Sequence, residues 1–327
     1  MKDLDFLYAI AKEYSFGEVL EKPHTVKGGF CHVVYKLNTT SGIYLIKLVG
    51  SNSPDNKPFR FWKEKDKMED KLFENKIPAV YSLVFNGSRV QQLNNQMFYV
   101  YPWFEGEIVR GRDASKKQTK LMAKYSALIN NIEYNPEAKR TKPVKIDWQY
   151  YIDYAKGKNQ FIYDSLVQNK AMLDDFVKKG NNRLCKMPKG SALSHCDMDY
   201  KNVMWTGDKC KLIDMDSIGY SNPYMLLFKN ALVWSGYEEC QIDYERFALF
   251  IKTYFKFSKL EKIKNLEDYF YATLIGPEWL EVNVKRALGL VGDSQALIEM
   301  GLSQTKITLA QIKNFIENKD KIINIKL

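Results

Sequence analysis

The sequence has few of the residues from which disulfide frameworks and histidine-rich metal sites are built. Among its 327 residues are five cysteines, scattered and without a CxxC pair, and only three histidines. This pattern argues against a disulfide framework and against a zinc site. Three histidines are also too few to favour a multi-histidine metal centre. We therefore expect reduced cysteines.

Long hydrophobic runs are missing as well. No apolar stretch approaches the roughly 20 residues that a membrane helix needs. The N-terminal stretch MKDLDFLYAIAKEYSF contains acidic residues and has no apolar segment followed by a cleavage site, as a signal peptide would. The expectation is a cytoplasmic protein without a membrane partner.

Positive charge is in excess, but it is not concentrated. The formal net charge is +10, and the lysines lie throughout the chain without a long basic block or an RNA-binding signature. The sequence therefore does not favour nucleic acid as a partner. Hydrophobic residues make up 45% of the chain, which is enough to build the core of one large domain or two modest ones.

The segment from about residue 23 to 104 has the pattern of strands interrupted by one helix. VVYKLNTT and GIYLIKLVG predict two strands joined by a hairpin through residues 39–42. A helix is predicted next, ending before Pro78. AVYSLVFNGSRVQQL and QMFYVYPWF then return to strand character, with a turn at Asn86-Gly87.

From about residue 112 the pattern is mostly helical, with one exception. NVMWT and KCKLIDM flank Gly207-Asp208 and predict a small hairpin. The sequence therefore predicts an α+β fold with a linker near Glu105-Gly106. Its N-terminal lobe, residues 1–104, would hold a small antiparallel sheet and one key helix. Its C-terminal lobe, residues 105–327, would be larger and mainly helical.

A polar constellation lies at the two outer ends of this hairpin, in SHCDMDYKN and LIDMDS. Asn202 and Asp214 could supply oxygen ligands to a hard cation such as Mg²⁺, while Asp197 is left to accept a proton. Asp and Asn also collect at ordinary turns, so each residue alone carries little weight. Their joint order, H-x-D followed by Asn and then a later Asp, is typical of phosphoryl transfer.

Phosphoryl transfer of this type also predicts partners upstream. Gly28 and Gly29 offer a glycine turn over phosphates, and Lys47 lies inside an apolar strand, where its ammonium needs a partner. We expect this partner to be Glu64, on the helical stripe of Phe61, Glu64, Met68 and Leu72. Glu69, on the poorer stripe of Trp62, Asp66 and Phe73, is the second choice. A nucleotide base would bind along the strand end at Pro102, Trp103 and Phe104.

These motifs together resemble the aminoglycoside phosphotransferase and choline kinase superfamily, small-molecule relatives of protein kinases. The resemblance covers about residues 25–224 and rests on LSHCDMDYKNVMW, LIDMDSIGYSNP and EKDKMEDKLFENKIP. It implies a bilobal protein-kinase-like fold, ATP or GTP as phosphate donor, and Mg²⁺ as cofactor. It further implies that Asp197 is the catalytic base and that Asn202 and Asp214 bind the metal. Lys47 and Glu64 would position the nucleotide phosphates, and His195 would brace the loop.

The acceptor is a small molecule by this resemblance, since the D-F-G and A-P-E motifs of protein kinases are absent. A polycationic aminoglycoside would need carboxylates, for which the candidates are Asp199, Asp216, Glu238, Glu239 and Asp243. Choline or a similar amine would need an aromatic cage, for which Tyr220, Tyr224, Trp234 and Tyr237 are available. Asp216 could instead contact a second metal. A catalytically silent nucleotide-binding protein is the alternative from another class.

Overall fold

The computed structural model describes residues 2–26, 32–50 and 57–327. Its contacts group the chain into two compact units. The first unit contains Met1–Ile108 and Lys201–Gly219, and the second contains Val109–Tyr200 and Tyr220–Leu327. In this grouping the predicted hairpin near residue 207 belongs to the first unit.

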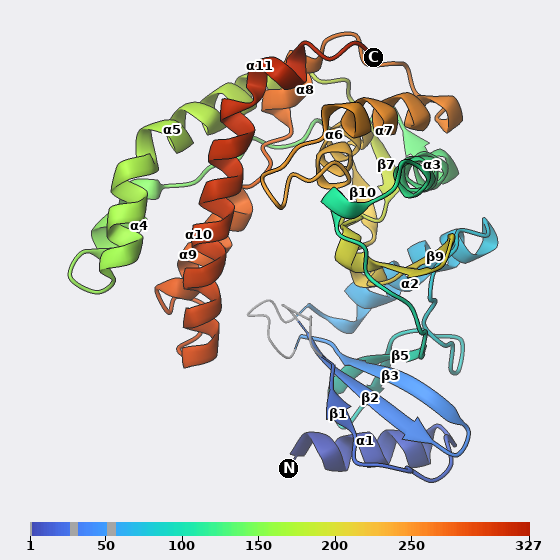
Figure 1. Cartoon of the computed structure of the whole chain (residues 1–327). Helices are drawn as coiled ribbons and strands as arrows, with labels where there is room; N and C mark the ends of the chain where they lie inside the picture. Colours follow the sequence, from blue (N-terminus) through green and yellow to red (C-terminus); the bar gives the residue numbers. More distant parts are fainter. Residues whose placement is uncertain (1, 27–31, 51–56) are drawn as a thin grey trace. The chain divides into compact units, whose positions relative to one another are not determined.

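The first unit is built around an antiparallel sheet of order β1-β2-β3-β5-β4 (Figure 1). Its strands are β1 His24–Thr25, β2 Val33–Thr39, β3 Gly42–Leu48, β4 Gln91–Leu93 and β5 Gln96–Pro102. The hairpin of β2 and β3 closes where Thr39 pairs with Gly42, whose φ of 148° suits a residue without Cβ. The predicted hairpin and the α+β class are thus confirmed.

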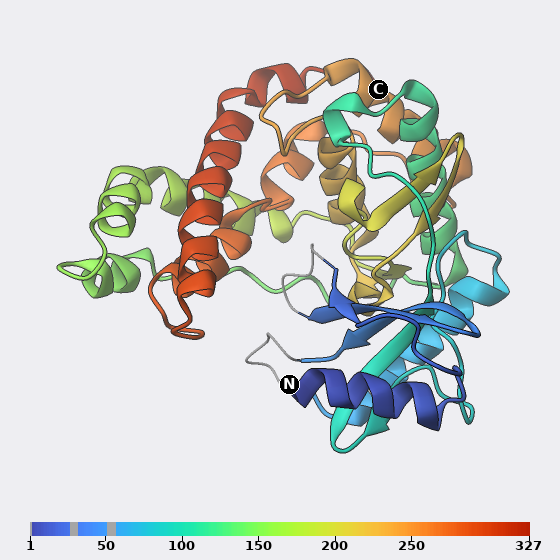
Figure 2. The same cartoon turned by 60° about the horizontal axis from the view of Figure 1, so that its bottom comes forward.

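Helix α1 (Lys2–Glu13) covers one face of this sheet, and Figure 2 shows it lying across the strands. Leu7 and Ile10 of α1 belong to one buried cluster with Leu37, Ile46 and Phe98 of the sheet. Burying apolar side chains of this size contributes about 1.5–3 kcal/mol each. The helix is therefore part of the core of the first unit.

Helix α2 (Phe59–Glu74) buries a face that the sequence pattern did not favour. Its buried residues are Trp62, Asp66, Glu69 and Leu72. The sequence pattern places Phe61, Glu64, Met68 and Leu72 on the core face. This prediction is corrected, because Phe61 and Glu64 are exposed. The reason is that Asp66 accepts hydrogen bonds from the backbone N–H groups of Arg89 (3.0 Å) and Val90 (3.1 Å), so a carboxylate is stable inside.

The chain between α2 and β4 is mostly irregular, where strands were predicted. Only isolated bridges form here, including Phe85 with Ser88 around the predicted Asn86-Gly87 turn. Side chains of α2 satisfy part of this backbone, beside single bonds to strand residues such as that from Leu83 N to Val100 O (2.7 Å). Glu69 accepts from the Ser82 N–H at 2.6 Å, for example. This explains how a segment rich in β-formers remains outside the sheet.

The predicted hairpin near residue 207 is confirmed as β8 (Val203–Thr206) and β9 (Lys209–Leu212). Leu212 at the end of β9 donates to Pro78 O (2.9 Å) and accepts from Val80 N (2.8 Å). A further bridge joins Glu107 to Trp205. These backbone bonds explain why the hairpin packs with the first unit.

The second unit is mainly helical. Its helices are α3 Lys116–Ile132, α4 Trp148–Ala155, α5 Gln160–Leu184, α6 Pro223–Val233, α7 Tyr244–Phe257, α8 Leu266–Ala272, α9 Pro277–Ala287, α10 Gln295–Glu317 and α11 Lys319–Ile323. A small sheet of order β10-β7-β6 accompanies them, with β6 Tyr134–Asn135, β7 Ser191–Ser194 and β10 Gly219–Ser221. Helices α9 and α10 lie side by side (Figure 1). Gly301 permits this, since a Cβ there would lie 2.3 Å from Ala287 N.

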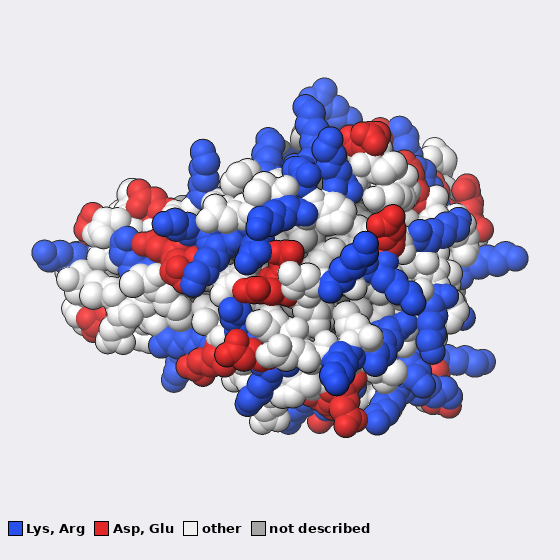
Figure 3. Space-filling view, turned by 90° about the horizontal axis from the view of Figure 1, so that it is seen from above, with Lys and Arg blue, Asp and Glu red and all other residues white. Residues whose placement is uncertain are grey.

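The surface of the protein carries mixed charge. Figure 3 shows Lys and Arg side chains spread over one face, with Asp and Glu side chains in several places between them. The net charge of +10 is therefore not gathered into a single block on this face. In the described part of the chain, no helix combines the length and apolar character needed to cross a membrane.

Candidate active site

Lys47 is a buried cation on β3. Only 7% of it is exposed, and its ammonium binds two carboxylates that follow β9 in the chain. Its Nζ lies 2.7 Å from Asp216 Oδ1 and also donates to Asp214 Oδ1. Burial alone would lower the pKa of Lys47, but the two negative charges outweigh it and hold the pKa above its usual value.

Asp214 and Asp216 differ in their surroundings. Asp214 has φ 66° and ψ 52°, a left-handed conformation that turns the chain directly after β9, and 38% of its side chain is exposed. Burial beside Asp216 raises the pKa of Asp214 to about 6, despite the attraction of Lys47. Asp216 is 13% exposed, and Lys47 and His32 overcome the effect of burial and hold its pKa well below the usual range.

Asn202 lies beside the start of this segment. It is 5% exposed and precedes β8, and its backbone oxygen accepts from Ile213 N at 2.9 Å across the hairpin. Asn202 and Asp214 therefore come from adjoining strand ends. An amide oxygen and a partly exposed carboxylate are donors of the hard type that Mg²⁺ prefers, so their chemistry is compatible with the predicted metal role, which stays a prediction.

Asp197 lies in the second unit, in the loop that follows β7. Several side chains hold this loop. Asn130 Nδ2 of α3 donates to Leu193 O and to Ser194 Oγ, both at 2.8 Å, and Tyr254 OH donates to Asn130 Oδ1 at 2.7 Å. These bonds anchor the end of β7, from which the loop with Asp197 starts, to α3, and Tyr254 of α7 orients Asn130 in turn.

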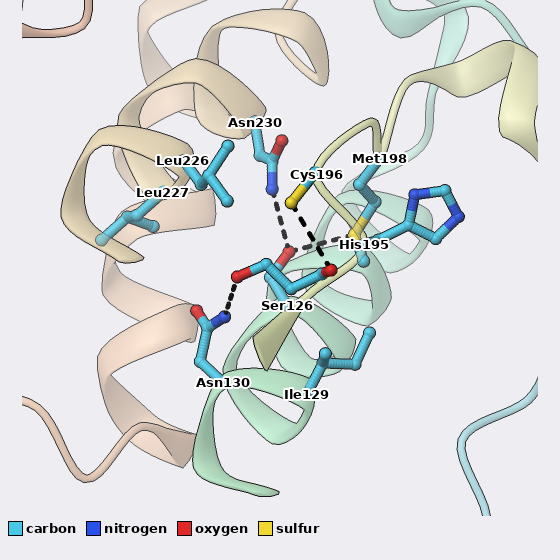
Figure 4. A pocket seen from close by; sticks show the side chains of 10 residues that line it. Ser126, Ile129, Asn130, His195, Cys196, Met198, Leu226, Leu227 and Asn230 are labelled. Atoms are coloured by element: carbon cyan, nitrogen blue, oxygen red, sulfur yellow. Dashed lines mark hydrogen bonds between the residues drawn. The ribbon is translucent and has the colours of Figure 1, made fainter. Parts of the chain in front are cut away.

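A small polar cavity lies under this loop (Figure 4). Its lining residues are Ser126, Ile129, Asn130, Ser194, His195, Cys196, Met198, Leu226, Leu227 and Asn230. Its volume of about 10 Å³ is near the minimum for one buried water molecule. His195, predicted to brace the loop, is 2% exposed and lines this cavity. Cys196 has φ 64°, a left-handed conformation that glycine adopts more readily than a residue with a Cβ.

Comparisons by sequence return no related protein: no family model matches the chain, and no curated protein does. Solved structures do match over nearly its whole length. Spectinomycin phosphotransferase, in complex with ADP and spectinomycin, superposes with a TM-score of 0.69 at 14% identity, over 96% of this chain and 98% of that chain.

Two further structures match in the same way. Amicoumacin kinase, in complex with AMP-PNP, Ca²⁺ and Ami, superposes with a TM-score of 0.61 at 13% identity, over 99% of this chain and 98% of that chain. A choline/ethanolamine kinase family protein from Mesorhizobium loti superposes with a TM-score of 0.54 at 12% identity, over 96% of this chain and 99% of that chain. The chain has the aminoglycoside phosphotransferase and choline kinase fold. The predicted protein-kinase-like fold is thus confirmed.

In this kinase fold, Glu64 of α2 does not meet Lys47. The Glu64 side chain is 62% exposed and binds Lys67, one turn along the same helix, at 2.6 Å. The predicted pair of Lys47 and Glu64 is therefore wrong. The second choice, Glu69, is buried but accepts from Ser82 N (2.6 Å) and Ser82 Oγ (2.9 Å). Burial raises the pKa of Glu69 to about 7, against the effect of Arg89.

His32 is a site residue that sequence reasoning missed. Its Nε2 lies 2.9 Å from Asp216 Oδ2, and its Nδ1 accepts from Gly50 N at 3.1 Å. The available signal was weak: a histidine directly before the strand that pairs with the strand of Lys47.

The remaining predicted nucleotide contacts have mixed outcomes. Gly28 and Gly29 lie outside the described residues. Pro102 ends β5, and Trp103 N donates to Ile43 O at 2.9 Å, so this N–H is used within the sheet. Phe104 is half-buried and packs against the core cluster that includes Trp62. Their roles toward a nucleotide base stay predictions.

The predicted acceptor residues divide into two groups. Trp234 is fully buried, with its indole donating to Met198 O at 2.9 Å, and Tyr237 is 5% exposed. Burial therefore argues against an aromatic cage made from these two side chains. In the second unit, the charges of Asp199, Glu238, Glu239 and Arg110 act on Tyr200. Burial and the three negative charges, Glu238 first, raise the pKa of Tyr200 to about 12, against the effect of Arg110.

Proposed function

We propose that this protein is a magnesium- and nucleotide-dependent kinase that phosphorylates a hydroxyl group of a small molecule. The observation that carries the proposal is Lys47, a buried ammonium on a strand of the kinase-like sheet, bound to two carboxylates directly after the β8–β9 hairpin. A lysine held in this way is suited to bind phosphate oxygens once a nucleotide enters.

The remaining roles follow from the chemistry of phosphoryl transfer. Asp197 accepts the proton of the acceptor hydroxyl as its oxygen bonds to the γ-phosphorus, and the bond from that phosphorus to the bridging oxygen breaks. The nucleoside diphosphate leaves with the electron pair of the broken bond. Asn202 and Asp214 would hold Mg²⁺, which neutralises charge on the phosphates when bound.

Two of the structural neighbours support a nucleotide and a small molecule as ligands. Spectinomycin phosphotransferase was solved with ADP and spectinomycin, and amicoumacin kinase with AMP-PNP, Ca²⁺ and Ami. At identities of 14% and 13% they support the reaction class for this chain, and they leave the acceptor open.

For the acceptor, we propose a small molecule with primary or secondary amines. The charges of Asp199, Glu238 and Glu239 on Tyr200 outnumber the one opposing cation, Arg110, and this excess of negative charge favours a cation that is bound by carboxylates. The burial of Trp234 and Tyr237 disfavours a quaternary amine held between these two rings. An aminoglycoside-type antibiotic or an amino sugar fits this chemistry better than choline does.

The test is release of ADP or GDP by the purified protein with ATP or GTP, Mg²⁺ and a panel of aminoglycosides, other hydroxylated antibiotics, amino sugars and choline. We expect phosphate transfer to an amine-bearing member of the panel. Asp197→Asn should abolish this transfer while nucleotide still binds, because the base acts on the acceptor and not on the donor. Magnesium-dependent nucleotide binding without transfer to any acceptor would instead indicate a catalytically silent protein.

The acceptor assignment has its own test. Replacing Glu238 and Glu239 by Gln should raise the acceptor KM by about tenfold and leave the nucleotide KM unchanged, because charge-assisted contacts to the acceptor are lost. Glu245→Gln is the matched control, since this carboxylate is 84% exposed in the same unit. Equal acceptor KM values in the double variant and the control would exclude the carboxylate cluster from the acceptor site.

A further inference from the structure

A buried lysine needs a permanent partner. Lys47 is 7% exposed, and an uncompensated ammonium inside a protein is costly. In protein kinases a glutamate on the helix after this strand fills the role. Here the two helix glutamates considered for it are engaged elsewhere: Glu64 binds Lys67, and Glu69 binds Ser82. Toward the segment after β9, α2 presents Lys65, which donates to Ile218 O.

The carboxylate that replaces the helix glutamate is Asp216, and its orientation is fixed from both sides. Its Oδ1 accepts from Lys47 at 2.7 Å, and its Oδ2 lies 2.9 Å from His32 Nε2. His32 is oriented in turn by the Gly50 N–H, which points to Nδ1 at 3.1 Å. Because Nδ1 is the acceptor, Nε2 carries the ring hydrogen and donates it to Asp216.

Asp214 is held less firmly than Asp216. Both carboxylates bind Lys47, but the side chain of Asp214 is 38% exposed and that of Asp216 is 13% exposed. Asp216 has a second anchor in His32, whose side chain is itself only 10% exposed. If Asp214 bound a metal ion, Asp216 would therefore still hold Lys47.

We propose that His32 and Asp216 are positioning residues that hold Lys47 for the phosphates of the donor nucleotide, in place of a glutamate from helix α2. The proposal rests on the proposed kinase function for its kinetic consequence. Its structural content, that His32 and Lys47 act as one unit through Asp216, is independent of that function. Their side chains both bind Asp216, one at each carboxylate oxygen.

The first experiment compares the kinetics of His32→Ala, His32→Gln and Asp216→Asn with those of the wild type. His32→Ala should raise the donor KM about tenfold with less than a threefold change in acceptor KM, because only Lys47 loses its orientation. His32→Gln keeps an N–H near the position of Nε2 and should restore the donor KM to within about threefold. Asp216→Asn, which removes the charge beside Lys47, should have the larger effect.

The matched control is His24→Ala. His24 is an exposed histidine on β1 of the same sheet, so its substitution should change neither the donor KM nor the acceptor KM. A donor KM for His32→Ala equal to that of the control, in a folded protein, overturns the proposal. A defect in His32→Gln as large as in His32→Ala also overturns it, since the donated hydrogen bond would then be irrelevant.

The second experiment needs no nucleotide. A double-mutant cycle with His32→Ala and Lys47→Met measures the unfolding equilibrium in urea. We expect the effects of the two changes on the unfolding constant to be coupled by about fivefold or more, because both side chains bind Asp216. Full additivity overturns the proposal. If the wild type binds no nucleotide, the kinase function fails, and this cycle alone decides whether the three residues form a unit.

Discussion

Two pairs of carboxylates in the first unit are held in different ways. Asp66 and Glu69 of α2 accept hydrogen bonds from three backbone N–H groups of residues 82–90, which cannot move without moving the chain, as well as from hydroxyl groups. Asp214 and Asp216 bind the side chains of Lys47 and His32, which can change partner. A carboxylate bound by backbone stabilises a fold, whereas one bound by side chains can take part in chemistry. The two pairs also differ in exposure, since Asp66 and Glu69 are 4% and 3% exposed, whereas the side chains of Asp214 and Asp216 are 38% and 13% exposed.

The largest effect should come from removing a site carboxylate. Asp214→Ala should lower kcat/KM by about a thousandfold and weaken magnesium-dependent nucleotide binding, because a metal ligand is lost. The urea midpoint should change little, since Lys47 keeps Asp216 as its partner. Steady-state kinetics and urea unfolding on the same preparation measure both quantities. A large loss of stability with normal turnover would reverse the assignment of the two pairs.

The next largest effect should come from the carboxylate pair of α2, Asp66 and Glu69. Asp66→Ala leaves the N–H groups of Arg89 and Val90 without their acceptor and the Tyr99 hydroxyl with Trp62 O alone, so it should lower the free energy of unfolding by about 3 kcal/mol. Urea unfolding measures this loss. The donor and acceptor KM of the folded fraction should stay unchanged. A kinetic defect without a stability defect would place Asp66 in the site.

A pH effect of intermediate size is expected at Glu69. Its pKa of about 7 in the folded protein lies above the ordinary value of 4.5, so the folded state binds the proton more tightly than the unfolded state. The stabilisation by protonated Glu69 is therefore present below pH 4.5 and is lost as the pH rises through 7.

Glu69→Gln isolates this contribution. Over that window the wild type should lose about 3 kcal/mol relative to Glu69→Gln, which keeps an oxygen for Ser82 N and cannot ionise. Urea unfolding at a series of pH values measures the difference. Parallel pH curves for wild type and variant would show that Glu69 does not titrate in this range.

The smallest effect is expected at Glu64, on the same helix as Asp66 and Glu69. Because its side chain is 62% exposed and binds only Lys67 in the described structure, Glu64→Gln should change the stability by less than about 0.5 kcal/mol and leave turnover unchanged. The same urea and kinetic assays apply. A tenfold fall in kcat/KM would restore Glu64 as the partner of Lys47 in the working enzyme and refute the role assigned to Asp216.

Much of the fold was predictable from local patterns. The hairpins around residues 40 and 207 follow from turn residues between short apolar strands, and Lys47 stood out as a cation in an apolar strand. The face of α2 was not predictable, because amphipathic reasoning places apolar residues inward. Here two acids face inward and bind the irregular segment after the helix. One arrangement thus explains both the wrong helix face and the missing strand.

The residue types of the candidate site were predictable from the sequence, but the partner of its buried lysine was not. The spacing of Asp197, Asn202 and Asp214 is local, so a motif can carry it. Lys47 and Asp216 are 169 residues apart in the chain, and no periodicity in either segment connects them. The partner of a buried charge depends on which distant segment the fold brings to it, and a single sequence does not contain that information directly.

The first unit is discontinuous in the chain, and this bears on how it can form. Residues 1–108 are synthesised well before residues 201–219, which supply Asp214, Asp216 and the backbone partners of Pro78 and Val80. Until that second segment arrives, Lys47 has to remain solvated, and the sheet around it cannot close. Excised residues 1–108 should therefore show no cooperative urea transition, and adding back 201–219 through a short designed linker should restore one. Completion of the fold and placement of the phosphate-binding lysine would then be one and the same late event on the ribosome.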